Sequence, residues 1–369
     1  MAKYICPRCF EEQDIANVEY VCTNTSRTRP CTKQRDKIHI KPENAKKPVC
    51  DECGQPLTRR VCPRCGFELP SNFDTAKGYP IAIIGAKESG KSNYVAVLIN
   101  QLKNEVGRSF NCSLMACGDK TINRYRTEFY NPVYRSKTAV RASDAGDVDP
   151  LIYSLVFQRK GGLFRKAVND SVSLTFYDTA GENLKNADDM MTFNKYLAHA
   201  SGIILLLDPL QLPEVRTQLE GKIRLPEENT DVTEILNRTI DVIRQQQNAG
   251  SNKPIDIPLA IAFTKIDAVT SLIDPSSCLN NDSVHVKNGY FSKSDFKDEN
   301  DEMQSLVDSW LGQELYQQVS TNFRTFGFFG LSALGSNPDM NNVIPKFRPF
   351  RVTDPFLWIL AKKNIIPEK

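Results

Sequence analysis

The sequence lacks a long hydrophobic run. Its richest apolar stretch, Ile203 to Leu207, is stopped by Asp208, whereas a helix that spans a bilayer needs about 20 apolar residues. The first residues, Met-Ala-Lys-Tyr-Ile-Cys, also meet charge at once, so they do not form the apolar core of a signal peptide. We therefore expect a cytoplasmic protein with no membrane segment.

An excess of one charge sign is also missing. The 369 residues contain 47 Lys and Arg against 44 Asp and Glu, which gives a formal net charge of +3. Bulk charge therefore does not indicate a polybasic protein that binds nucleic acid or a membrane surface. Hydrophobic residues make up 40% and charged residues 25%, as in ordinary globular proteins. The length allows one large core and a smaller module.

Cysteine is scarce over most of the chain, because only Cys112, Cys117 and Cys278 follow residue 66. The other eight are crowded into the first 65 residues. A cytoplasmic chain does not keep structural disulfides, so closely spaced thiols indicate metal binding. The eight candidate zinc ligands are Cys6, Cys9, Cys22, Cys31, Cys50, Cys53, Cys62 and Cys65.

These cysteines divide by spacing into two groups of four. The pairs Cys50-x2-Cys53 and Cys62-x2-Cys65, eight residues apart, resemble a zinc ribbon, in which four thiolates close a tetrahedron around a structural Zn²⁺. The second group is then Cys6, Cys9, Cys22 and Cys31. Two alternatives stay open: His39 replaces one thiol, or the pairs are shared between the two sites in another order. Either way we expect two Zn²⁺ per chain.

The composition changes near residue 70 and suggests two parts with separate cores. We expect a zinc-binding module over 1–70, a linker over 71–79 and a nucleotide-binding domain over 80–369. Two all-thiolate zinc sites would bring the charge of the module close to neutral. The module is therefore expected to dock partner proteins, and nucleic acid is disfavoured as its ligand.

The second part begins with a phosphate-binding signature. A buried-strand run, Tyr79 to Ile84, leads into Gly85-x4-Gly90-Lys91-Ser92. In this pattern the backbone N–H groups surround the phosphates, the lysine reaches the β- and γ-phosphates, and the serine hydroxyl binds Mg²⁺. The predicted binding stretch is Gly85, Ala86, Lys87, Glu88, Ser89, Gly90, Lys91, Ser92 and Asn93.

Three further motifs each follow a predicted strand. Ser171 to Tyr177 precedes Asp178-Thr-Ala-Gly181-Glu182, where Asp178 can hold the Mg²⁺ shell and the Gly181 N–H can contact the γ-phosphate. Ile257 to Phe263 precedes Thr264-Lys265-Ile-Asp267, whose carboxylate can accept from N1–H and the 2-amino group of guanine. Gly327 to Leu331 precedes Ser332-Ala333-Leu334, where a backbone N–H can meet guanine O6.

Together these four motifs resemble the ordered nucleotide-binding boxes of Ras-like P-loop GTPases. The resemblance implies an α/β fold, a mostly parallel, doubly wound sheet with helices on both faces. The insertions would lie near 211–256 and 270–320. The zinc module, the Leu207-Asp208-Pro209-Leu210 segment and the Asp-Thr-Ala-Gly-Glu motif also resemble the bacterial double-GTPase group of phage-defence and conflict systems. That resemblance implies partner proteins encoded in the same operon.

Several positions depart from the Ras-like pattern. Thr264 stands where Asn is usual, Lys87 where a small residue lies beside the γ-phosphate, and Glu182 where many members have a water-orienting Gln. Thr138 is our choice for the second side-chain ligand of Mg²⁺, beside Ser92 and Asp178. Thr121 and Thr127 are weaker candidates, because Asp119 to Tyr130 is predicted to be helical.

The leading functional hypothesis is a switch that binds GTP and hydrolyses it slowly to GDP and phosphate. The candidate catalytic residues are Glu182, Lys91, Thr138, Gly181 and Lys87. Glu182 can accept a hydrogen bond from water but cannot donate one as Gln can, which is why intrinsic hydrolysis is expected to be slow. Two alternatives are a nucleotide-stabilised scaffold and a zinc-dependent nucleic-acid adaptor, both with negligible turnover.

Overall fold

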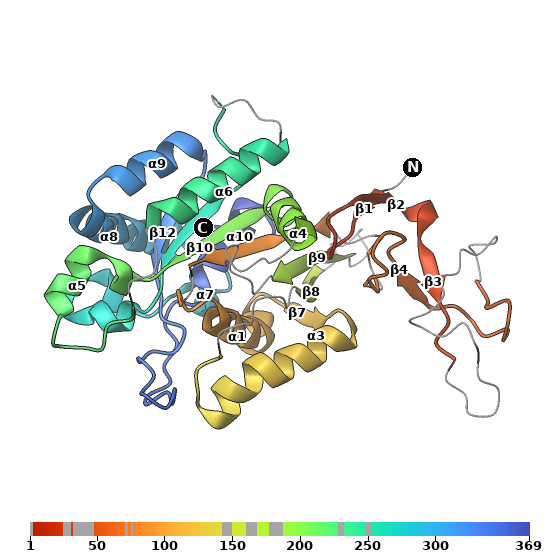
Figure 1. The fold of residues 1–369 in the computed structure, drawn as a ribbon, viewed down its shortest axis with the longest axis horizontal. Coiled ribbons are helices and arrows are strands. Elements are labelled where there is room, and N and C mark those ends of the chain that lie inside the picture. Colours follow the sequence, from red (N-terminus) through yellow and green to blue (C-terminus); the bar gives the residue numbers. More distant parts are fainter. Residues whose placement is uncertain are drawn as a thin grey trace.

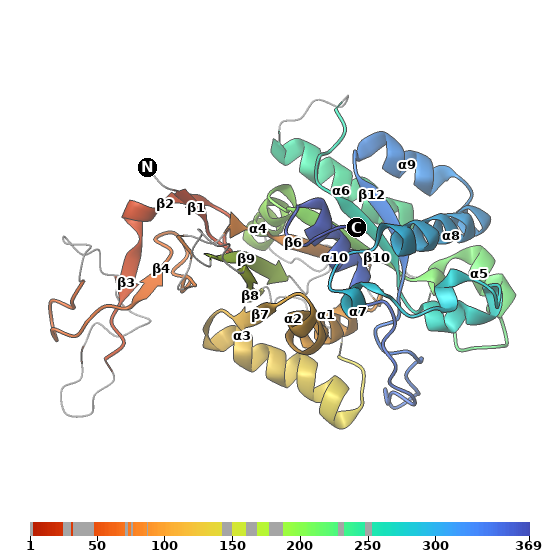
Figure 2. The same cartoon turned by 180° about the vertical axis from the view of Figure 1, so that it is seen from behind.

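The structure is a computed structural model of the whole chain. It describes residues 3–24, 31, 48–70, 73–74, 77–86, 88–141, 150–159, 168–176, 187–227, 232–247 and 253–369. Within these residues two neighbouring four-stranded sheets pack against helices, and a Cys-rich N-terminal part extends from one end of the molecule (Figures 1 and 2).

A parallel four-stranded sheet forms the centre of the molecule. Its order is β12 (Phe326–Gly330), β11 (Leu259–Phe263), β10 (Gly202–Leu207) and β6 (Ile81–Gly85). In β6, β10 and β11 every residue is buried. This burial on both faces explains why these strands are continuous apolar runs. Because the strands are parallel, the motifs that follow β6, β11 and β12 all lie at the same edge.

A second sheet continues the first through the chain segment that precedes β6. Its order is β5 (Lys77–Gly78), β9 (Val168–Phe176), β8 (Leu151–Arg159) and β7 (Cys112–Ala116). β5 pairs with β9 in parallel, and β8 is antiparallel to both β7 and β9. The chain leaves β5 through Tyr79, whose N–H bonds to Ser173 O, and enters β6 after Pro80.

Alternate residues of the central strands face two separate cores. Ile81, Ile83 and Ile204 belong to the core beneath α1 (Lys91–Gln101) and α10 (Asp354–Lys362). Ile84 and Leu205 face the other core. That core is completed by α4 (Ala187–Ala198), α5 (Pro213–Leu219), α6 (Val232–Gln247), α8 (Lys293–Leu311) and α9 (Glu314–Asn322).

The remaining elements are short. The helix after α1 continues to α2 (Gly107–Ser109), and the helix that begins as α3 (Gly118–Arg124) runs on to Ser136 in π-helical geometry. α7 (His285–Asn288) precedes α8. The N-terminal part contains two antiparallel pairs, β1 (Lys3–Ile5) with β2 (Glu12–Asp14) and β3 (Glu19–Val21) with β4 (Arg59–Val61).

The predicted fold class is confirmed: a largely parallel α/β sheet with helices on both faces follows a small Cys-rich part. Helices α5 and α6 lie in the predicted insertion 211–256, and α7, α8 and most of α9 lie in 270–320. None of the helices among the described residues is both long enough and apolar enough to cross a membrane.

Candidate nucleotide and metal sites

A cavity of about 540 Å³ opens at the carboxyl edge of the parallel sheet. Three of the four predicted motifs contribute to its wall, although they are separated by more than 240 positions in the sequence. From these motifs the lining residues are Ala86, Glu88, Gly90, Lys91, Ser92, Asn93, Thr264, Lys265, Asp267, Ser332, Ala333 and Leu334. The structure therefore brings together almost all the described residues of the predicted binding set.

The loop between β6 and α1 has the tight backbone that its glycines predict. A Cβ on Gly85 would lie 2.5 Å from Ser89 Oγ and 2.6 Å from Leu206 O, so no larger residue fits there. Gly90 has φ of +83° and caps the N-terminus of α1. Lys91 is the first helical residue and is largely buried. The helix N-terminus therefore faces the cavity, a suitable position for an anion.

Thr264 ties the base end of the cavity to the phosphate loop. Its hydroxyl donates to Ser89 O at 2.9 Å and lies 3.1 Å from Leu207 O. The Thr264 hydroxyl thus links two backbone segments, at the position where the Ras-like pattern has an Asn. The next residue, Lys265, adopts φ of +52° and pairs with the buried Asp208 at 2.6 Å. Asp208 therefore positions the Lys265 stem along the cavity wall, a role that we did not predict.

Among the described residues that line the cavity, Asp267 is the only one with a carboxyl group at the base end. Burial raises the pKa of this carboxyl, while a hydrogen bond from Ser332 and the charge of Lys265 oppose the rise. Ser332 Oγ also accepts from the Gly335 N–H at 2.8 Å. The carboxylate is therefore held in place but has lost part of its hydration, which favours a ligand that offers N–H donors.

Segment 137–141 covers the side of the cavity nearest α1. Asn93 Oδ1 accepts from the Val140 N–H at 2.8 Å, so the first turn of α1 positions this segment. Ala139, Val140 and Arg141 line the cavity, but Thr138 does not. Thr138 forms a β-bridge with Val343. The structure therefore does not bring the preferred magnesium ligand to the cavity, although Arg141, which we did not single out, lies there.

The weaker threonine candidates also lie elsewhere. Thr121 Oγ1 accepts from the Ile152 N–H at 3.3 Å, and Thr127 Oγ1 donates to Asn123 O at 2.9 Å. Both side chains bond to neighbouring backbone. They lie in the helical stretch that we predicted over 119–130, as the structure confirms.

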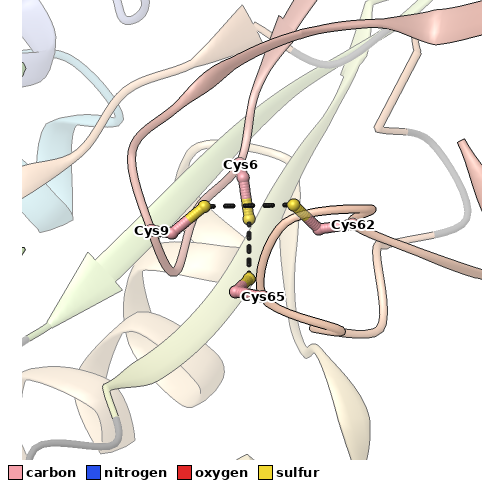
Figure 3. Close-up of side chains that lie close together, drawn as sticks. All are labelled: Cys6, Cys9, Cys62 and Cys65. Atoms are coloured by element: carbon pink, nitrogen blue, oxygen red, sulfur yellow. Dashed lines mark hydrogen bonds between the residues drawn. The ribbon is translucent and has the colours of Figure 1, made fainter. Parts of the chain in front are cut away.

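The eight N-terminal cysteines form two clusters, within each of which all four Sγ atoms lie within 4.8 Å of one another. Sγ–Sγ distances are 3.7 Å for Cys6–Cys65 and 3.9 Å for Cys9–Cys62 in one cluster, and 3.6 Å for Cys22–Cys53 in the other. A zinc tetrahedron with Zn–S bonds of about 2.3 Å has an edge of about 3.8 Å. Figure 3 shows the four sulfurs of the first cluster pointing toward one centre. Both clusters therefore fit structural Zn²⁺.

The order in which we paired the cysteines was wrong. The proximal cluster contains Cys6, Cys9, Cys62 and Cys65, and the distal cluster contains Cys22, Cys31, Cys50 and Cys53. The antiparallel pair β3–β4 is the physical reason. Its register places Val21 opposite Arg59 and Glu19 opposite Val61, so Cys22 and Cys62 leave the pair at opposite ends. The alternative in which pairs are shared between sites is the correct one.

Three of the four cysteine pairs are backbone knuckles of one design. The N–H of the first cysteine bonds to a carbonyl five residues later, in Cys6–Glu11, Cys50–Gln55 and Cys62–Phe67. The residue after the second cysteine has positive φ in each. It is Gly54 or Gly66 in two knuckles, but Phe10 in the third.

Phe10 connects the proximal cluster to the main body. Its ring is 1% exposed and lies 5.3 Å from the Tyr196 ring of α4. Thr175 of β9 donates to Pro7 O at 3.1 Å, and Lys195 pairs with Glu11 at 2.5 Å. The N-terminal part has two small hydrophobic clusters of its own, but Phe10 belongs to the core of the sheet and links the two parts. Figures 1 and 2 both show β1 and β2 beside α4 and β9.

A third group of potential metal ligands consists of His285, Asp295 and Asp354. A buried arginine already supplies the positive charge beside these carboxylates. The Arg351 guanidinium lies 2.9 Å from Asp295, 3.0 Å from Asp354 and 3.2 Å from Glu299. Arg351, Glu299 and Asp354 are almost fully buried, and Asp295 is partly buried. We therefore assign this group to the packing of α7, α8 and α10 rather than to a metal site.

With this geometry in view, the family can be assigned. The sequence description of the family named Double-GTPase 2 matches residues 79–311, which is more than half of the chain. The chain belongs to the Double-GTPase 2 family. The predicted double-GTPase resemblance is thus confirmed.

Individual relatives are more distant. A curated protein of Mycolicibacterium smegmatis, named "Putative ESX-1 scaffolding and assembly protein SaeC", is 25% identical over 330 residues, which cover 83% of this chain and 80% of the relative. Among solved structures, the Arl6 BBS3 small GTPase from Trypanosoma brucei matches 78% of this chain and 98% of its own, with 13% identity and a TM-score of 0.32. The Ski7 GTPase-like domain from S. cerevisiae matches 78% and 51%, with 15% identity and a TM-score of 0.35.

Four predicted residues of this Double-GTPase 2 chain lie outside the described residues. They are Lys87, Asp178, Gly181 and Glu182. Their proposed roles at the magnesium ion and the γ-phosphate therefore stay predictions. The elements on either side of the Asp178–Glu182 motif are described, since β9 ends at Phe176 and α4 begins at Ala187.

Proposed function

We propose that this Double-GTPase 2 chain is a molecular switch that binds GTP with Mg²⁺ and hydrolyses it slowly. The observation that supports this proposal best is the single cavity lined by the phosphate loop, the Thr264–Asp267 motif and the Ser332–Leu334 motif. We propose that residues 80–369 form the GTPase domain, with 1–70 as the zinc-binding module and 71–79 as the linker.

The lining residues would bind the phosphates at one end of the cavity and the base at the other. The backbone of 85–90, the helix N-terminus and Lys91 would bind the phosphates, and Ser92 with Asp178 would hold Mg²⁺. Mg²⁺ neutralises charge on the phosphates when it is bound. At the other end Asp267 would accept from the two N–H groups of guanine, a pair of donors that adenine lacks. The Lys265 stem would cover the base.

Substitution of Asp267 by Asn tests whether the Asp267 carboxylate recognises the guanine base. The amide replaces one acceptor by a donor, so the affinity for GTP should fall at least about 100-fold, because hydrogen bonds to a charged group contribute about 1.5–3 kcal/mol each. Affinity for xanthosine triphosphate, whose C2 oxygen is an acceptor, should rise. Titration calorimetry with the full chain measures both values.

Asp256→Asn is the matched control, because Asp256 is an exposed carboxylate paired with Arg324 on the surface. It should leave both affinities unchanged. An unaltered GTP affinity in Asp267→Asn would show that Asp267 does not read the base.

The name of the SaeC relative favours a second candidate function, a nucleotide-stabilised scaffold that turns GTP over negligibly. Release of phosphate over many turnovers separates the two. If the protein is a switch, the wild-type chain releases phosphate steadily and Lys91→Ala does not. If it is a scaffold, the wild-type chain and Lys91→Ala release phosphate at the same background rate.

We also propose that the zinc module docks partner proteins encoded in the same operon, in a system that acts in phage defence. Exposed apolar side chains support a docking role, since Val49 beside the distal cluster is 55% exposed and Ile5 beside the proximal cluster is 39% exposed. Pull-down from cells that express the whole operon, with and without Val49→Asp, tests this proposal.

A further inference from the structure

The segment after the Ser332–Leu334 motif forms a long closed ribbon. Ser332 and Phe350 exchange two backbone hydrogen bonds of 3.0 and 2.8 Å, and the Arg348 N–H bonds to Leu334 O at 2.9 Å. Gly335 permits this approach, because a Cβ there would lie 2.1 Å from Arg348 O. The ribbon of residues 332–350 therefore begins at the base end of the cavity and returns to it.

The tip of the ribbon is shaped by one aspartate. Asp339 Oδ1 accepts from the N–H groups of Asn341 and Val343, both at 2.8 Å. Asn342 then adopts φ of +65°, a conformation that Asn tolerates better than most residues. The turn presents Asn342 and Val343 toward segment 137–141.

Four contacts join this tip to segment 137–141. The Ala139 N–H bonds to Asn342 O at 2.9 Å, and Asn342 Nδ2 donates back to Ala139 O at 3.0 Å. The Ile344 N–H bonds to Lys137 O at 2.8 Å, with Thr138 opposite Val343. At the base of the ribbon, Phe347 lies 5.3 Å from Tyr134. In Figure 1 the blue ribbon reaches the yellow end of the helix that precedes Lys137.

Both partners of this junction line the cavity. Ala139, Val140 and Arg141 form one side, and Ser336, Asn337, Pro338 and Asn342 extend the other. The ribbon is rooted in the base-binding motif, whereas segment 137–141 is held by Asn93 on the phosphate side. The junction therefore connects the base side of the cavity to the phosphate side, so a nucleotide that spans the cavity would contact both.

We propose that residues 332–350 are a clasp that retains the bound nucleotide, and that Asn342 is the positioning residue that closes it. The inference rests on the proposed function, because it concerns the guanine nucleotide of the same cavity. It adds to that function a built-in control of nucleotide release. The clasp makes the intrinsic exchange of GDP slow without a partner protein.

The first test opens the clasp. Asn342→Gly keeps the backbone bonds and the positive φ but removes the side-chain amide. Met340→Ala is the matched control, because Met340 is at the same tip and is 89% exposed. The full chain is loaded with mant-GDP, and its release is followed after addition of excess GDP. Asn342→Gly should release mant-GDP about tenfold faster, with an unchanged association rate, and Met340→Ala should match the wild type.

The second test locks the clasp. Thr138 and Val343 face each other at a non-hydrogen-bonded position, where Cα atoms lie about 4.5 Å apart, within the range that a disulfide spans. The double variant Thr138→Cys with Val343→Cys serves as its own control when oxidised and reduced. Oxidation should slow release at least tenfold, and reduction should restore it. The wild-type chain, oxidised and reduced in the same way, controls for effects of this treatment on the eight N-terminal cysteines.

Three outcomes overturn the proposal, and they are distinguishable. Equal release rates for wild type and Asn342→Gly, or for the oxidised and reduced double variant, would show that the junction does not retain nucleotide, while the proposed function stands. A wild-type chain that binds no mant-GDP would overturn both the clasp and the proposed function.

Discussion

The two cysteine clusters have the same ligand chemistry but different relations to the rest of the chain. The proximal cluster has Phe10 after its first knuckle, and that ring is buried in the core of the sheet beside α4. The distal cluster packs only with Leu57, Tyr20 and its own cysteines among the described residues. A cluster of four cysteines can therefore be a fixed part of a larger core or a small local core, depending on the residue that follows the knuckle.

This difference follows from a local conflict that the fold resolves. Gly54 and Gly66 accept positive φ without cost, whereas a phenylalanine there is strained. The burial of the Phe10 ring repays the strain, because a fully buried phenylalanine contributes about 2–3 kcal/mol. The knuckle that has Phe10 in place of a glycine is therefore the one that contacts the main body.

The largest expected effect comes from Phe10→Ala. Loss of the ring should lower the free energy of unfolding of the main body by about 3 kcal/mol. Denaturant unfolding followed by tryptophan fluorescence measures it, because both tryptophans of the chain, Trp310 and Trp358, lie in the main body. Leu57→Ala, the control at the distal cluster, should leave this transition unchanged. Equal effects of the two substitutions would contradict the comparison.

A middle-sized effect is expected when one zinc site is removed. Cys62→Ser and Cys53→Ser should each reduce the zinc content from two ions per chain to one, as elemental analysis would show. Only Cys62→Ser should lower the tryptophan-monitored stability, by roughly 1–2 kcal/mol, because among the described residues the proximal cluster contacts β9 and α4 through Pro7 and Phe10. A wild-type content of one zinc would remove the basis for two sites.

The smallest effect is expected at Glu11, which pairs with Lys195 and, at 3.6 Å, with Arg64. Both ion pairs are partly exposed, so Glu11→Gln should cost less than about 1 kcal/mol. The hydrogen bond from Lys195 lowers the pKa of Glu11, so its stabilising contribution is present above the usual carboxyl pKa and is lost as pH falls through the lowered value. The wild type and the variant should converge in acid, with Glu12→Gln as the control.

Much of the candidate site could be predicted because its motifs are local. Gly85 to Ser92 encodes a turn and a helix start within eight residues, and Asp267 and Ser332 follow apolar runs that can only be buried strands. Parallel strands then place their ends at one edge, so the lining of the cavity by these residues follows from the pattern of the chain. The role of Thr264 was less accessible, because its partner is Ser89 O, 175 positions away.

The sequence by itself determined the order of the nucleotide motifs, the fold class and the set of eight cysteines that gather into clusters fit for a metal, since each depends on spacing within a short segment. Only the tertiary structure decided which cysteines share a cluster, because the register of β3 and β4 carries Cys22 and Cys62 to opposite ends. It also decided that Phe10 enters the main core and that Asn342 meets Ala139. These contacts join segments far apart in the chain, and their geometry depends on the packing of the elements between them.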